Sequence, residues 1–128
     1  MPARYVILKE QRLVVSIGWD RLTFADFANQ QEQFLADPDF DPSFDQLVDG
    51  SKVTVLDLSV EEAKIISRRP IFLPSSRRAV VATDPAIFGM GRMMDAYHTQ
   101  ATRREYVAVF YDLASALKWL GRDSLPDY

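Results

Sequence analysis

Residues 47–66, LVDGSKVTVLDLSVEEAKII, decide the fold because strand and helix signals follow one another directly in this stretch. Two apolar runs predict strands, and Asp49-Gly50-Ser51 between them predicts a turn. Ser59 and Glu62 then form an S-x-x-E capping box, in which each side chain satisfies a backbone N–H at the start of a helix. A strand that leads into a capped helix indicates an α/β architecture.

Strand and helix signals alternate along the rest of the chain. We expect strands at residues 5–8, 13–17, 78–83 and 105–111 and in the two runs 46–48 and 53–58, and helices at 23–37, 59–68, 84–101 and 113–120. Gly18 is expected to end the second strand. The order predicts one α/β domain, residues 1–121, with a single mixed sheet of about five strands covered by about four helices. An N-terminal hairpin precedes parallel crossovers, and residues 122–128 are expected to be a frayed tail.

Composition narrows the functional classes. The 128 residues carry a net charge of −3, so the chain lacks the basic surplus that is typical of nucleic-acid-binding modules. The arginine pairs 68–69, 77–78 and 103–104 are interpreted as solvated flanks, with small-anion binding as the alternative. The chain has no cysteine, no signal-peptide pattern and no apolar run long enough to span a bilayer. We therefore predict a cytoplasmic protein without a membrane span.

Three segments give the chain a resemblance to a known superfamily. They are residues 18–26 (GWDRLTFAD), residues 47–66 and residues 107–120 (VAVFYDLASALKWL). In order and spacing they resemble the STAS-like superfamily, specifically the SpoIIAA-like bacterial proteins related to anti-sigma-factor antagonists and to the SEC14 lipid-binding fold. The resemblance implies a regulatory or protein-interaction domain that is not an enzyme. The relation to SEC14 implies a carrier or sensor of a small apolar ligand as the alternative.

The switch region departs from the pattern of that family. Anti-sigma-factor antagonists carry Asp-Ser-Ser-Gly at the helix start, whereas this chain has Asp57-Leu58-Ser59-Val60. Losing the glycine removes close backbone access for a kinase. Ser59 is also explained as a helix N-cap, which typically contributes ~1 kcal/mol. We interpret Ser59 first as a cap, keep Asp57 and Ser59 as the regulatory candidates that the resemblance implies, and regard Ser51 as a lesser candidate.

The sequence motifs typical of catalytic, metal and cofactor sites are incomplete in this chain. The D-x-D-x-D run at Asp37 has Pro42 where an EF-hand needs glycine and Val48 where it needs glutamate. Gly89 and Gly91 lack the third glycine of a dinucleotide fingerprint. His98, the only histidine, is expected to complement a helix end at the surface rather than to act in a triad. We predict no enzyme activity, no metal and no cofactor.

Two segments carry apolar side chains that the expected core does not use. On the helix from Pro85, Phe88, Arg92 and Met93 are expected to form an exposed contact surface for a protein partner or a second copy of the chain. In the loop at residues 70–76, Ile71, Phe72 and Leu73 are interpreted either as a cover over Phe88 or as a lid over an apolar ligand.

Overall fold

Five strands form one mixed sheet in the computed structural model, which describes residues 2–102, 107–126 and 128. In spatial order they are β1 (Ala3–Leu8), β2 (Leu13–Thr23), β3 (Asp45–Asp57), β4 (Arg78–Val81) and β5 (Val107–Phe110). β1 pairs antiparallel with β2, and all later neighbours pair parallel. The helices are α1 (Phe24–Leu35), α2 (Val60–Arg68), α3 (Pro85–Thr102) and α4 (Leu113–Trp119). The predicted mixed α/β sheet and its four helices are thereby confirmed.

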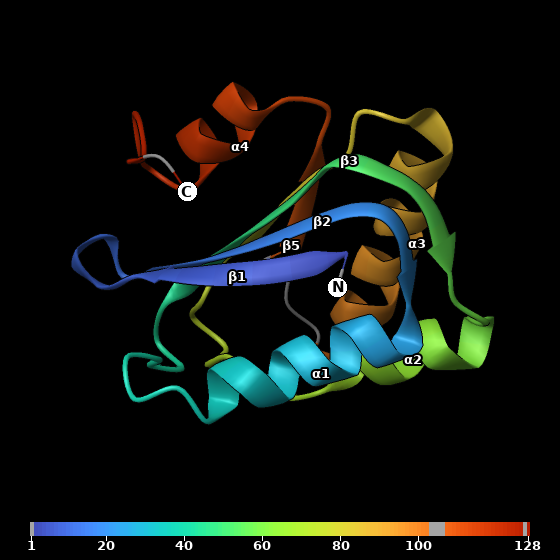
Figure 1. Ribbon diagram of the computed structural model, residues 1–128, viewed down its shortest axis with the longest axis horizontal. Coiled ribbons are helices and arrows are strands. Elements are labelled where there is room, and N and C mark those ends of the chain that lie inside the picture. The colour runs from blue at the N-terminus through green and yellow to red at the C-terminus, as the bar shows by residue number, and fades with distance from the viewer. Residues whose placement is uncertain (1, 103–106, 127) are drawn as a thin grey trace.

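The spatial order of the strands equals their order in the sequence, so the chain crosses the sheet in one direction only. Right-handed crossovers in one direction place all their helices on the same face. Accordingly α1, α2 and α3 cover one face of the sheet, and α4, which follows the last strand, covers the other (Figure 1). Since the strand order never reverses, the sheet lacks the switch-point crevice where doubly wound sheets bind ligands.

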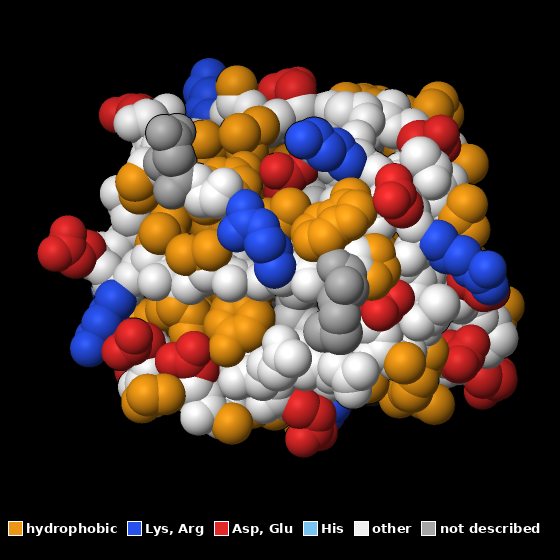
Figure 2. Space-filling view, viewed as in Figure 1, with side chains coloured by type: hydrophobic (Ala, Val, Ile, Leu, Met, Phe, Trp, Pro, Cys, Tyr) orange, Lys and Arg blue, Asp and Glu red, His pale blue; other side chains and the backbone are white. Residues whose placement is uncertain are grey.

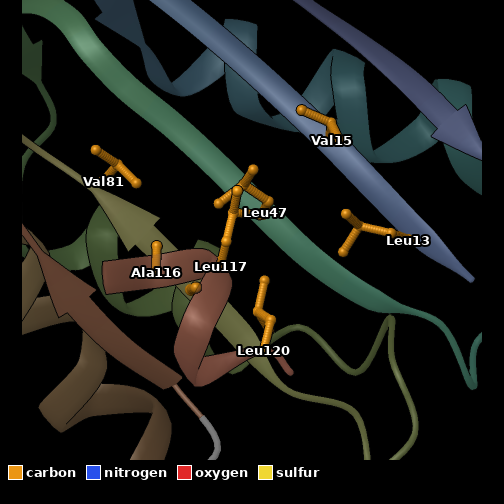
Figure 3. Close-up of a cluster of buried hydrophobic side chains, with 8 residues drawn as sticks. Leu13, Val15, Leu47, Val81, Ala116, Leu117 and Leu120 are labelled. Atoms are coloured by element: carbon orange, nitrogen blue, oxygen red, sulfur yellow. The ribbon is translucent and has the colours of Figure 1, made fainter. Parts of the chain in front are cut away.

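The α4 face of the sheet is closed by aliphatic side chains. Leu13, Val15 and Leu47 of β2 and β3 meet Ala116, Leu117 and Leu120 at the C-terminal end of the fold (Figure 3). On the opposite face, apolar residues form two separate clusters, one around Phe34 and the other around Ile87. The candidate site described below lies between these two clusters.

Local signals fix the helix starts and the hairpin. Ser59 accepts a hydrogen bond from the backbone N–H of Glu62, and the Glu62 side chain accepts one from the Ser59 N–H, which confirms the capping box. Thr23 and Asp26 form the same arrangement at the start of α1. A short 3-10 turn, η1 (Lys9–Gln11), followed by Arg12 in the left-handed region, closes the predicted β1–β2 hairpin.

The two central strands are longer than predicted, and two glycines explain why. β2 continues past Gly18 to Thr23, and β3 runs without a turn through Asp49-Gly50-Ser51. A Cβ at Gly50 would lie 2.9 Å from the carbonyl oxygen of Val81, and one at Gly18 would lie 2.8 Å from Leu22. Both glycines therefore allow close packing within the sheet rather than ending a strand. Predicting a strand end and a turn there was wrong.

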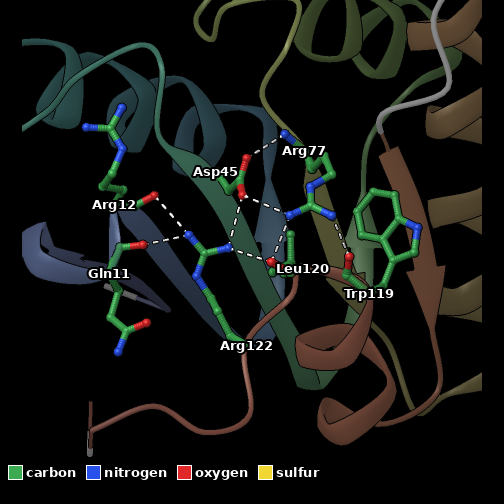
Figure 4. Close-up of polar contacts among 7 residues, drawn as sticks. All are labelled: Gln11, Arg12, Asp45, Arg77, Trp119, Leu120 and Arg122. Carbon is green, nitrogen blue, oxygen red and sulfur yellow. Dashed lines mark hydrogen bonds and ion pairs between the residues drawn. The ribbon is translucent and has the colours of Figure 1, made fainter.

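The C-terminal tail packs on the sheet instead of fraying. Arg122 donates to Asp45 at 3.0 Å and to the carbonyl oxygen of Gln11 at 2.6 Å (Figure 4). Leu125 and Tyr128 pack against the core cluster on the α4 face, and the Tyr128 hydroxyl donates to Asp49 at 3.1 Å. Residues 122–126 and 128 thus belong to the folded domain.

Candidate functional site

A row of polar side chains crosses the middle of the sheet on the face that α1, α2 and α3 cover. Gln46 of β3 is the register partner of Arg78 of β4, and its Nε2 donates to Ser16 Oγ of β2 at 2.9 Å. The alternation of side chains along a strand sends their neighbours Leu47 and Ala79 into the core on the opposite face. Polar residues therefore occupy positions where a two-sided sheet usually has aliphatic ones.

A cavity of about 140 Å³ lies between this row and the three helices. Apart from the polar row and a few further polar side chains, its wall is apolar and includes Leu22, Phe27, Phe34, Leu56, Ile66 and Met94. An apolar cavity of roughly 150 Å³ in an engineered protein is large enough to take up benzene. The cavity can therefore hold an apolar group of about one ring.

A second cavity of about 440 Å³ lies under the loop that follows α2. Ile71, Phe72 and Leu73 line it, together with four arginines: Arg68, Arg69, Arg77 and Arg78. The part of this wall that the structure describes contains no acidic residue. Gln46, Arg78, His98 and Val107 line both cavities. The two spaces therefore meet at the polar row.

Arg78 is the charged residue at this junction. Its Nε is buried and has no hydrogen-bond partner within the described part of the chain. The guanidinium carbon lies 5.4 Å from the centre of the Phe72 ring, close enough for a cation–π contact. Burial lowers the pKa of Arg78 to about 10, so the side chain stays charged at neutral pH although its environment opposes the charge.

His98 of α3 lines both cavities at the junction. Its Nδ1 lies 3.1 Å from the carbonyl oxygen of Ser67 in α2. Burial is the main cause that lowers the pKa of His98, and the nearby charge of Arg78 acts in the same direction. The Ser67 carbonyl and Asp95 oppose this shift. His98 therefore lies between two helices and is partly buried, and our prediction of a surface position was wrong.

The predicted helix-start residues lie outside the walls of both cavities. Asp57, at the end of β3, forms an ion pair with Arg21 at the surface. Ser59 caps α2 and is exposed. The Ser51 hydroxyl donates to Asp49 at 2.7 Å within β3. Each side chain has a structural partner, and their regulatory role stays a prediction.

In the predicted contact surface on α3, Phe88 packs against Tyr111 and not against the loop at residues 70–76. Phe88 is partly buried and stacks on Tyr111, with ring centres 3.8 Å apart and planes 4° apart. It is thus less exposed than predicted. Arg92 is exposed and Met93 is partly buried. Ile71 packs in the cluster around Phe34, so the loop at residues 70–76 does not cover Phe88. A docking role for this surface stays a prediction.

The aspartates of the D-x-D-x-D run serve loop structure. Asp37 and Asp41 each accept a hydrogen bond from a backbone N–H two residues later. Within the described residues, no three His, Cys, Asp or Glu side chains gather in a way that would hold a metal ion. The same part of the chain contains no helix with the length and apolar character to cross a bilayer.

Charge on the surface is mixed. Figure 2 shows acidic and basic side chains distributed among apolar ones on one face of the molecule. Two of the three arginine pairs instead border the second cavity, which brings residues 68–69 and 77–78 together from two elements. The third pair, residues 103–104, lies outside the described residues.

Comparison with known proteins supports the fold. A scan against protein-family models finds no match, and a search of curated proteins also finds none. Among solved structures, the chain is similar to an uncharacterized protein of the DUF3478 family with a SpoIIAA-like fold from Shewanella loihica PV-4. The TM-score is 0.59 at 20% identity, over 92% of this chain and 93% of the other. The protein therefore has a SpoIIAA-like fold, as the resemblance implied.

Proposed function

We propose that this protein binds a small, largely apolar molecule between its sheet and its helices, as a carrier or sensor without catalytic activity. The observation that carries the proposal is the cavity of about 140 Å³, whose wall is mainly apolar. Empty cavities of this size are few in well-packed domains, because each one forfeits dispersion contacts of its lining. A ligand that fills the space restores those contacts.

The loop after α2 supports the same proposal. Leu73 in this loop is 48% exposed, although it borders the second cavity. Its backbone N–H donates to the carbonyl oxygen of Pro42 at 2.8 Å, so the loop is held against the segment before β3. The space that this loop covers shares part of its wall, at the polar row, with the first cavity. This arrangement fits the lid that we predicted for Ile71, Phe72 and Leu73.

A neutral aromatic probe tests the proposal. We expect that titration with 3-phenylpropan-1-ol shifts the backbone amide NMR signals of residues around the first cavity. In the Val80→Phe variant, a ring fills part of the cavity that Val80 lines, and the shifts should disappear. Val55→Phe is the matched control, because Val55 is 47% exposed and lies outside the cavity wall. Equal shifts in both variants, or no shifts in the native protein at millimolar probe, would overturn the proposal.

A further inference from the structure

We propose that Arg78 binds the carboxylate of a small organic acid, whose apolar body lies in the first cavity. The inference rests on the proposed function, because it assumes that the cavity takes up a ligand, and it adds the charge class of that ligand. It concerns the junction of the two cavities, where Arg78 is the cationic side chain common to both walls.

The first step concerns the hydrogen-bond partners of Arg78. Its Nε is buried and without a hydrogen-bond partner among the described residues. A buried donor that stays unsatisfied costs ~1–3 kcal/mol, and more when the group is charged. Native structures rarely leave such a group unsatisfied, and a water, an ion or a ligand supplies the partner. The contact with the Phe72 ring supplies only part of the missing interaction, because it leaves the Nε–H donor unused among the described residues.

The second step is that two neighbouring arginines already donate hydrogen bonds to protein groups, and a third is exposed to solvent. Arg69 donates to Gln31 and to Glu32, the latter at 2.7 Å. Arg77 donates to the carbonyl oxygens of Trp119 and Leu120, both at 2.8 Å. Arg68 lies at the end of α2 and is exposed to solvent. Among the described residues at the junction, Arg78 is the cation with a buried, unsatisfied donor, which matches a ligand with one negative charge. A carboxylate also fits the two parallel N–H donors of a guanidinium.

The third step is the orientation of the ligand. Asp95 contributes to the wall of the first cavity, where its carboxylate opposes a second negative charge. Among the described residues, the wall of the second cavity includes no acidic one. The carboxylate therefore lies at the Arg78 end, toward the second cavity, and the apolar body points between Phe27, Phe34 and Met94. A small aromatic or short aliphatic acid has this shape.

A matched pair of probes separates the two proposals. 3-Phenylpropanoate and 3-phenylpropan-1-ol share the same body and differ in the charged group. For the native protein we expect the carboxylate to bind at least about tenfold more tightly than the alcohol, which corresponds to ~1.4 kcal/mol. Arg78→Met keeps an apolar stem without the charge, and we expect the ratio of the two affinities to fall to about one. Arg78→Lys should restore part of the preference, because it keeps the charge without the planar fork.

Two controls guard against a general charge effect or a folding defect. Arg92→Met removes one charge from the exposed side of α3, outside both cavity walls, and should leave the preference intact. In the native protein, the NMR signal of the Arg78 Nε–H group should move with the carboxylate and not with the alcohol. This second measurement needs no substitution.

The outcomes are distinct. Equal affinity of the native protein for the two probes overturns the role of Arg78 and leaves the apolar cavity standing as a binding site. Failure of both probes to bind overturns the proposed function as well. If inorganic phosphate moves the Arg78 signal as strongly as the carboxylate does and displaces it, the junction is a general anion site, and the proposal of an organic acid is wrong.

Discussion

At the scale of single residues, His98 makes the stability of the protein depend on pH. Its pKa is lowered from the ordinary value of 6.5, mainly by burial, with the charge of Arg78 adding to the shift. The unfolded chain then takes up a proton at higher pH than the folded protein does. The stability that neutral His98 contributes is complete above pH 6.5 and is lost as the pH falls from there through the lowered folded pKa.

We therefore expect His98→Gln to flatten the pH dependence of the free energy of unfolding on the acidic side of neutrality. Urea unfolding of both proteins at a series of pH values measures the difference. Aspartate and glutamate residues titrate in both proteins, so their contribution cancels in this comparison. Parallel profiles for the native protein and the variant would show that His98 has the same pKa folded and unfolded.

Residues differ in how far the sequence reveals their role. Ser59 and Glu62 could be predicted because both partners of a capping box lie within one turn of the same helix. The row of Ser16, Gln46 and Arg78 could not, because it depends on the register of three strands that are far apart in sequence. The only local signal is a polar residue inside or beside an apolar run, which is common at the ends of strands.

At the scale of elements, the tail after α4 is fixed to the sheet by a buried ion pair. The side chains of Arg122 and Asp45 are only 14% and 16% exposed, and their atoms lie 3.0 Å apart. Arg122 also donates to two main-chain carbonyl oxygens near the β1–β2 hairpin, those of Gln11 and Arg12 (Figure 4). One side chain thus joins the C-terminal segment to the start of β3 and to the hairpin.

Replacing Arg122 by methionine should cost about 3 kcal/mol of stability, because it removes the closer of the two cations beside the largely buried Asp45 and leaves Arg77, whose guanidinium lies 3.7 Å away. We expect the lower end of the usual range, since the backbone N–H of Arg77 still donates to Asp45 at 2.8 Å. Urea unfolding measures the loss. Arg21→Met is the matched control. The side chains of Arg21 and its partner Asp57 are 66% and 50% exposed, so losing this ion pair should lower the free energy of unfolding far less. Equal losses in the two variants would contradict the assignment of the tail to the folded domain.

Strand lengths show where element prediction fails. The segment Asp49-Gly50-Ser51 has the composition of a turn, yet β3 passes through it: Asp49 pairs with β2 and with β4, and the pairing with β2 resumes at Lys52 after an irregularity. Gly50 is needed for the close approach of the Val81 carbonyl, which is a tertiary contact that local composition does not encode. Helix starts were predicted better, because their hydrogen-bond partners are local.

At the scale of the whole molecule, the two faces of the sheet have different roles. The α4 face is closed by small and branched aliphatic side chains, several of them fully buried. On the other face, three crossover helices cover a sheet whose middle is polar, and both cavities lie on this side. The alternation of strands and helices predicts the topology, but the cavity depends on how side chains from seven elements fill the space between the layers.

This difference between the faces predicts opposite responses to the same substitution. Val15 is fully buried in the cluster against α4, so Val15→Leu should overpack that face and cost ~1–3 kcal/mol. Val48 lines the first cavity, so the added methylene of Val48→Leu has free space and should change stability by less than about 1 kcal/mol. Urea unfolding compares the two variants, and Val48→Leu should also weaken binding of 3-phenylpropan-1-ol. A loss of stability in Val48→Leu as large as in Val15→Leu would mean that the helix-covered face is as tightly packed as the other, and that it has no room for a ligand.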